Sequence, residues 1–97
     1  MAYGIVLRFE NVTEAQYWAV NEKLGIDRSG KGDYPAGLIV HSGGPVAGGG
    51  WVVSELWDSK ATQQAWMAGR LGAALGAVGI PEPVQVIETD TVNVYQA

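Results

Sequence analysis

The sequence predicts an α+β fold in which an antiparallel sheet of four strands carries two helices on one face. Two observations predict this class. First, the segments follow the order strand, helix, strand, strand, helix, strand, with an extended tail behind them, which is a split βαβ order. Second, the stretch 51–57, WVVSELW, places apolar side chains on both of its faces, which is typical of a central strand covered on both sides.

The first strand and the first helix follow from periodicity and from a capping pattern. Residues 3–10 alternate in polarity and size as the side chains of a strand do. Thr13 and Gln16 fit a capping box, in which each side chain satisfies a backbone donor of the other residue. We therefore expect a helix that runs to about Leu24 and ends at Gly25.

A glycine-rich segment separates the second strand from the third. Residues 37–42, GLIVHS, read as a short strand after a turn-rich loop, and residues 43–50, GGPVAGGG, contain five glycines. A phosphate-binding loop would need a helix start and a lysine behind the glycines, but the strand 51–57 follows. We therefore interpret residues 43–50 as a mobile hairpin loop.

The second helix is expected to begin after Ser59, whose side chain can cap it. Its second half carries an apolar stripe suited to packing on a sheet. Three interior glycines, each costing about 1 kcal/mol relative to alanine, predict an interruption near Gly72. Trp66 lies off the stripe, so we expect it to face a partner.

The C-terminal part reads as extended chain. Pro81 and Pro83 end the second helix, because a proline lacks the backbone N–H that a helix interior needs. Residues 84–88 read as the fourth strand. Residues 91–95 read either as another short strand or as a continuation of the fourth strand past a bend.

Composition excludes several classes of function. A net charge of −4 without a run of lysine or arginine argues against nucleic acid and against an anionic membrane surface. The sequence has no cysteine, and it shows neither a signal peptide nor an apolar run of about 20 residues that could span a membrane. We expect a soluble cytoplasmic protein.

The predicted order is that of a ferredoxin-like βαββαβ domain over residues 1–97, and it leaves one sheet face without helices. Only 16% of the residues are charged and 47% are hydrophobic, so a small monomer would have an apolar surface to cover. With no chain left over for that face, we expect a second copy to cover it. The sequence therefore predicts a homodimer packed sheet to sheet.

Several local motifs carry a resemblance to a known family. The second strand bears a histidine, GGW at 49–51 opens the third strand, Trp57-Asp58-Ser59 closes it, and Arg70-Leu71-Gly72 follows in the helix. Together they resemble the dimeric α+β barrel superfamily, most closely its antibiotic biosynthesis monooxygenase-like branch. That superfamily includes cofactor-free monooxygenases that form quinones, polyketide cyclases, muconolactone isomerases and haem-degrading enzymes. The resemblance implies a pocket between sheet and helices in each subunit, bordered by Trp57.

His41 is the candidate general base, since it is the only histidine and its ordinary pKa lies near neutrality. The alternative is a strand histidine that satisfies a loop carbonyl. If the hairpin is centred near Val46, His41 lies opposite Trp51 or its neighbour, and in the first register it shares a face with Trp51 and Glu55. Glu55 is then either a second catalytic group, which orients the imidazole, or a structural carboxylate paired with Arg8 or Arg70.

Four aromatic residues are candidates for substrate binding. Trp51 and Trp57 could form a wall for a planar ligand, or they could belong to the core. Tyr34, in the turn-rich loop, could cover the pocket and donate a proton. Tyr17 on the first helix is expected to pack there and to line any cavity.

The sequence offers no evident cofactor or metal site. One histidine without cysteine is too little for zinc, and no dinucleotide-binding fingerprint is present. Haem binding in this superfamily would call for a histidine on a helix, whereas His41 lies in a predicted strand. The first hypothesis is a cofactor-independent enzyme acting on a phenolic or polyketide-like molecule. The alternative is a non-enzymatic dimer that binds a small apolar or aromatic ligand or another protein.

Overall fold

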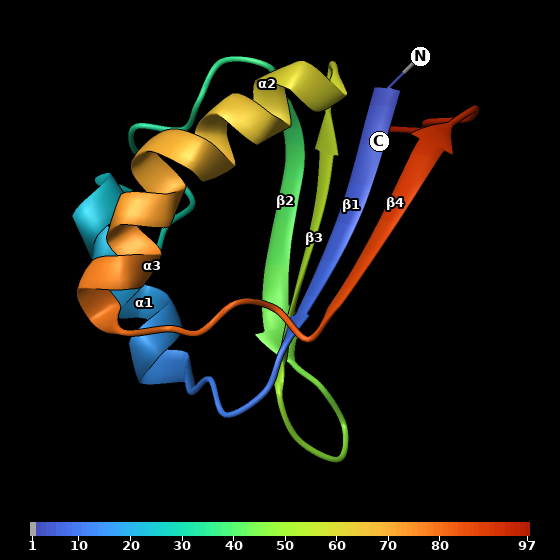
Figure 1. The fold of residues 1–97 in the computed structure, drawn as a ribbon. Coiled ribbons are helices and arrows are strands. Elements are labelled where there is room, and N and C mark those ends of the chain that lie inside the picture. The colour runs from blue at the N-terminus through green and yellow to red at the C-terminus, as the bar shows by residue number, and fades with distance from the viewer. Residues whose placement is uncertain (1) are drawn as a thin grey trace.

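The computed structural model describes residues 2–97 and confirms the predicted order of elements (Figure 1). The elements are β1 (Ala2–Phe9), α1 (Glu14–Leu24), β2 (Leu38–Pro45), β3 (Trp51–Trp57), α2 (Lys60–Trp66), a π-helical turn η1 (Met67–Leu71), α3 (Gly72–Val78) and β4 (Gln85–Thr91). Because α2, η1 and α3 follow one another without a break in the chain, they form the second helical arm of a ferredoxin-like fold.

The four strands form one antiparallel sheet in the order β2-β3-β1-β4, and the helices cover one of its faces (Figure 1). In β1 every second side chain is buried beneath the helices, namely Tyr3, Ile5, Leu7 and Phe9. Full burial of an apolar side chain of this size contributes about 1.5–3 kcal/mol to folding. The core of the domain is therefore the layer between this sheet face and the helices.

The helix α1 begins and ends as its sequence predicts. The side chain of Thr13 accepts from the Gln16 backbone, and the Gln16 side chain accepts from the Thr13 backbone N–H, so the capping box is confirmed. Gly25 ends the helix in the left-handed conformation, with φ of 76°, which glycine adopts without steric cost. These two ends set the position of Tyr17 on the first turns of α1.

The second helical arm is capped by Ser59, as predicted, and it is interrupted three residues earlier than expected. Gly69 has φ −102° and ψ −111°, outside the helical region, within the π-helical turn η1. The prediction that Trp66 faces a partner is wrong. Its side chain is buried in the core, and the guanidinium of Arg70 stacks 4.9 Å above its ring.

The strand β2 continues to Pro45, beyond the predicted end at residue 42, because Gly43, Gly44 and Pro45 pair with β3. The connecting loop is correspondingly shorter. It is closed by a hydrogen bond from the Val46 N–H to the Gly50 carbonyl, at 3.0 Å. Two of the glycines that indicated a loop are thus strand residues.

The second sheet face is uncovered in the single chain. It presents half-exposed or exposed apolar side chains from all four strands: Val6, Val40, Val52, Leu56 and Ile87. We call these five residues the open face. The tail beyond β4 forms no strand of its own, so β4 is one continuous strand through Thr89 and Asp90.

Candidate functional site

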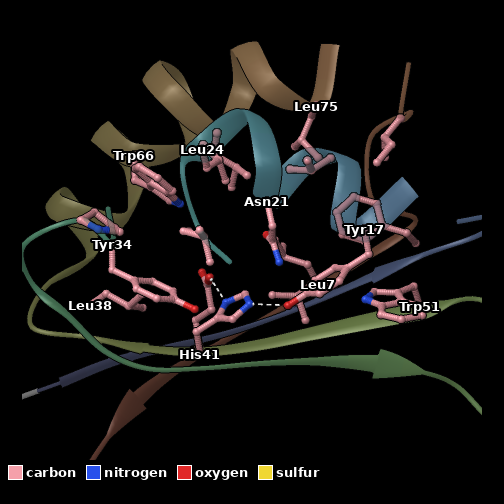
Figure 2. Close-up of a pocket in the computed structure, with 18 of the residues that line it drawn as sticks. Leu7, Tyr17, Asn21, Leu24, Tyr34, Leu38, His41, Trp51, Trp66 and Leu75 are labelled. Carbon is pink, nitrogen blue, oxygen red and sulfur yellow. Dashed lines mark hydrogen bonds and ion pairs between the residues drawn. The ribbon is translucent and has the colours of Figure 1, made fainter. Parts of the chain in front are cut away.

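A cavity lies between the helix-covered face of the sheet and the helices (Figure 2). Its volume is about 60 Å³, and the empty space including its open mouth is about 680 Å³. The first value is the room that water-sized molecules have inside the cavity, enough for a few of them, and the second includes space that is open to solvent. The walls are mainly apolar, with contributions from Leu7, Val20, Leu24, Leu38, Leu71 and Leu75.

One wall of the cavity carries a chain of hydrogen bonds that joins three elements. The Tyr17 hydroxyl on α1 lies 2.7 Å from Nε2 of His41 on β2, and the opposite ring nitrogen, Nδ1, lies 2.8 Å from Oε2 of Glu55 on β3 (Figure 2). Nε1 of Trp57 donates to the other oxygen of Glu55, at 3.0 Å. His41 and Glu55 are therefore held by partners on both sides. We call Tyr17, His41 and Glu55 the relay.

The register of the hairpin differs from the one expected. His41 pairs with Glu55, and Pro45 pairs with Trp51, so His41 does not lie opposite Trp51 or its neighbour. The reason is the extension of β2, which moves the centre of the hairpin from Val46 toward Gly48. This shift preserves parity, so His41, Trp51 and Glu55 nevertheless share the helix-covered face.

The carboxylate of Glu55 fixes the tautomer of His41. A carboxylate only accepts hydrogen bonds, so Nδ1 of His41 carries the proton that is donated to Glu55. Nε2 is then an acceptor, and the Tyr17 hydroxyl donates a hydrogen bond to it. The suggested pairing of Glu55 with Arg8 or Arg70 is wrong, because these arginines bond to other groups: Glu10, Gln85, the Leu24 carbonyl and Asp33.

Tyr17 lines the cavity together with His41 and Glu55. Burial raises the pKa of its phenol, the charges of Tyr34 and Glu55 raise it further, and the Asn21 side chain lowers it. Tyr17 is therefore a neutral O–H donor at neutral pH. Its ring lies over Gly43, where an added Cβ would come within 2.8 Å of the ring and hydroxyl. The glycine thus makes room for the phenol.

The other predicted residues take different places. Tyr34 lines the cavity, with its ring centroid 6.4 Å from that of His41. Trp51 also lines it and packs 4.9 Å from the Tyr17 ring. Trp57 does not line it, contrary to the expectation. Its side chain is fully buried in the core, where its indole N–H donates a hydrogen bond to Glu55.

Sequence reasoning missed Asn21 and Trp66, which both line the cavity. A signal for Asn21 exists in the sequence. It follows Tyr17 by four residues, so a helix places both side chains on one face. The position of Trp66 depends on how η1 turns the second arm, and no sequence pattern shows that rotation.

Three solved structures with the same fold give the site a context. No family model and no curated protein matches the sequence. A protein from Chloroflexus aurantiacus J-10-fl, named as an antibiotic biosynthesis monooxygenase, is 18% identical, with a TM-score of 0.69 over 99% of this chain and 98% of its own. A mutant of MhuD with two manganese protoporphyrin IX molecules per active site is 19% identical, with a TM-score of 0.60 over 100% of both chains. A dimeric ferredoxin-like protein from Thermobifida fusca is 20% identical, with a TM-score of 0.52 over 91% of this chain and 86% of its own.

These likenesses define the class of protein. The chain is a ferredoxin-like α+β domain with a cavity between sheet and helices. Within that class it shares its fold with the antibiotic biosynthesis monooxygenase-like proteins, as the sequence motifs indicated. In the part of the chain that the structure describes, no helix has the length and apolar character needed to cross a membrane.

The residues of the cavity do not fit a porphyrin of the kind bound by MhuD. Both nitrogens of His41 already hold partners, Tyr17 and Glu55, so neither is free for an axial bond to iron. His41 also lies on β2 and not on a helix.

Proposed function

We propose that this chain is a small cofactor-independent enzyme that removes a proton from a phenolic or polyketide-like molecule. His41 is the general base, Tyr17 conducts the proton to it, and Glu55 stabilises the charged imidazole. The observation that carries the proposal is the relay itself, because its three residues line a mainly apolar cavity. A partly buried chain of this kind suits proton abstraction from an aromatic or enolisable compound.

The proton moves in two coupled transfers. Tyr17 Oη takes a proton from the substrate O–H or activated C–H while its own proton passes to Nε2 of His41 over 2.7 Å. Because the pKa of Tyr17 is raised, the phenolate alone is not a stable intermediate at neutral pH. The imidazolium that results is stabilised by Glu55, whose carboxylate lies 2.8 Å away.

The substrate anion then determines the reaction. In an oxygenation, the electron-rich anion reduces molecular oxygen directly, so that neither a metal nor a flavin has to supply the electrons. In a cyclisation or isomerisation, the same anion reacts within the molecule. The name of the neighbour from Chloroflexus aurantiacus favours the first of these outcomes.

We propose that the working form is a homodimer that buries the open face. Val40 and Ile87 are 44% and 48% exposed in the single chain, on a sheet face that no helix covers. A second copy would remove this apolar surface from water without touching the cavity on the other side. The dimeric neighbour from Thermobifida fusca supports this arrangement.

A ligand-binding module is the second candidate, and one observation favours it. Nε2 of His41 is occupied by the Tyr17 hydroxyl, so the base reaches a ligand only through a second group. In this alternative the cavity binds a small apolar or aromatic molecule without converting it.

Oxygen consumption with an anthrone-type tricyclic ketone in air tests the proposal. His41→Ala should lower the turnover number at least about 100-fold, the contribution typical of a general base. Tyr17→Phe should also lower it, because the proton path is cut. Tyr95→Phe, in the exposed tail, is the matched control and should leave turnover unchanged. A folded His41→Ala protein with full turnover would overturn the proposal that the chain is an enzyme with His41 as its base. Tight binding of the ketone without any turnover by the wild type would favour the ligand-binding module.

A further inference from the structure

The indole N–H of Trp51 is a buried hydrogen-bond donor without an acceptor. Trp51 is 5% exposed, and its Nε1 is the one buried side-chain nitrogen or oxygen for which residues 2–97 provide no partner. Folded proteins rarely leave such a donor unpaired, because it has lost its bonds to water. Trp57, by comparison, donates its indole N–H to Glu55.

The orientation of the Trp51 ring places this donor at the cavity. Figure 2 shows its nitrogen on the side of the ring that faces Tyr17 and the interior. The neighbouring Tyr17 ring does not accept the bond, because the two planes are inclined by only 33°, and an N–H lying in one plane does not point at the face of the other. The donor is therefore left without an acceptor, on the side of the ring that faces the cavity.

The rest of the lining defines the ligand that fits. Within residues 2–97 no lysine or arginine lines the cavity, and both oxygens of Glu55 are engaged by His41 and Trp57. A carboxylate or phosphate ligand would thus enter an apolar space without a countercharge, at a high desolvation cost. A neutral aromatic ketone matches the site, since it offers a flat apolar body and one acceptor oxygen.

We infer that Trp51 Nε1–H is the anchor for the carbonyl oxygen of a neutral aryl ketone, beside the hydroxyl of Tyr17. The inference rests on the proposed function and specifies its substrate class. When the proton leaves the carbon next to the carbonyl for Tyr17 Oη, the electron pair of the broken C–H bond moves onto the carbonyl oxygen. The Trp51 donor then faces a developing enolate, where a fixed donor is most effective.

Two probes that differ only in the oxygen test the anchor: 1-tetralone and tetralin. In ¹⁵N–¹H spectra of the wild type, the assigned indole resonance of Trp51 should move downfield with 1-tetralone and stay in place with tetralin. This measurement needs no variant, so it holds even if a substitution at position 51 impairs folding. An indole resonance that is unmoved by saturating 1-tetralone overturns the inference.

Calorimetry of a variant gives the second readout. Trp51→Phe keeps an aromatic ring and removes the N–H, so the affinity for 1-tetralone should fall about tenfold, as for the loss of one hydrogen bond, while that for tetralin changes little. Trp18→Phe is the matched control, because its N–H bonds to Glu14 at the surface. An equal loss for both probes would show a packing role and overturn the anchor.

The two proposals fail separately in these experiments. If the Trp51 resonance responds to the ketone but no anthrone-type compound is turned over, the role of Trp51 as an anchor is supported and the proposed enzymatic function is overturned. If turnover depends on His41 while the Trp51 resonance never responds, the proposed enzymatic function is supported and the role of Trp51 as an anchor is overturned.

Discussion

At the residue scale, the site depends on small side chains as much as on reactive ones. Gly43 lies two residues after His41 on the same face of β2, and the ring of Tyr17 occupies the space that a Cβ would need. The relay therefore requires a glycine at that point of the strand, although glycine is otherwise unfavourable there.

Gly43→Ala should displace the Tyr17 phenol from His41 and leave the fold in place. The added Cβ would approach Tyr17 to 2.8 Å, and the phenol end of a side chain can move. We expect turnover to fall about 10–100-fold, the effect typical of displacing a catalytic group such as the Tyr17 phenol by about 1 Å. The free energy of unfolding should change by no more than about 1 kcal/mol. Steady-state kinetics and urea unfolding measure the two effects.

Gly44→Ala is the control for this change. A Cβ at that position meets no atom within 4 Å, so turnover should stay at the wild-type level. Equal losses in the two alanine variants would point to a general effect on β2 and contradict the role assigned to Gly43.

The residues of the site were only partly predictable. The shared face of His41, Trp51 and Glu55 follows from strand parity, and the structure brings His41 and Glu55 into contact. The link to Tyr17 depends on where α1 lies above the sheet, and no spacing within one element determines that position. Trp57 was expected at the cavity because the family resemblance implied it, but the cavity ends before Trp57.

At the element scale, β4 is joined to the rest of the sheet by a polar contact as well as by its backbone. The Tyr3 hydroxyl on β1 donates to Oε1 of Glu88 on β4 at 2.6 Å, and Lys60 on α2 lies 3.2 Å from the same oxygen. Burial and this hydrogen bond raise the pKa of Tyr3 to about 12, while Tyr3 and Lys60 hold the pKa of Glu88 below its ordinary range.

The raised pKa of Tyr3 predicts a loss of stability at high pH. The pKa of Tyr3 rises from 10.0 in the unfolded chain to about 12 in the fold, so its contribution is complete below pH 10 and disappears as pH rises toward 12. Circular dichroism of urea unfolding at pH 9 and pH 12 measures it. Tyr3→Phe should lose less free energy of unfolding over this interval than the wild type, whereas Tyr95→Phe should behave like the wild type. The same decline in all three proteins would contradict the assignment.

The order and ends of the elements were more predictable than their pairing. The caps at Thr13, Gly25 and Ser59 act locally, so the sequence around each is sufficient to place them. The end of β2 was not predictable in this way. Gly43, Gly44 and Pro45 have low strand propensity, and they extend the strand only because β3 offers hydrogen-bond partners.

At the scale of the whole molecule, the sheet separates two surfaces. One face encloses the cavity beneath the helices, and the other is the open face. The fold class and its four-stranded sheet were predictable, because element order alone limits the arrangements that a chain of this length can adopt.

A charge on the open face should prevent the proposed dimer. Ile87 pairs with Val6 and is 48% exposed, so Ile87→Lys would place an ammonium group in the expected interface. Size-exclusion chromatography with light scattering should show a dimer for the wild type and a monomer for this variant. Val86→Lys is the control, because Val86 is 51% exposed and points to the opposite side of β4. A wild-type monomer, or a dimer that tolerates both lysines, would contradict the sheet-to-sheet assembly.

The alternation along β3 has a consequence for how this protein can diverge. Trp51, Val53 and Glu55 belong to the cavity, while Val52, Ser54 and Leu56 point away from it. Substitutions at odd positions therefore change the cavity, and those at even positions change the open face, without interfering with each other. A one-residue insertion within this strand would exchange both sets at once, so lineages that change length should do so at the glycine turn before β3 and spare the strand itself.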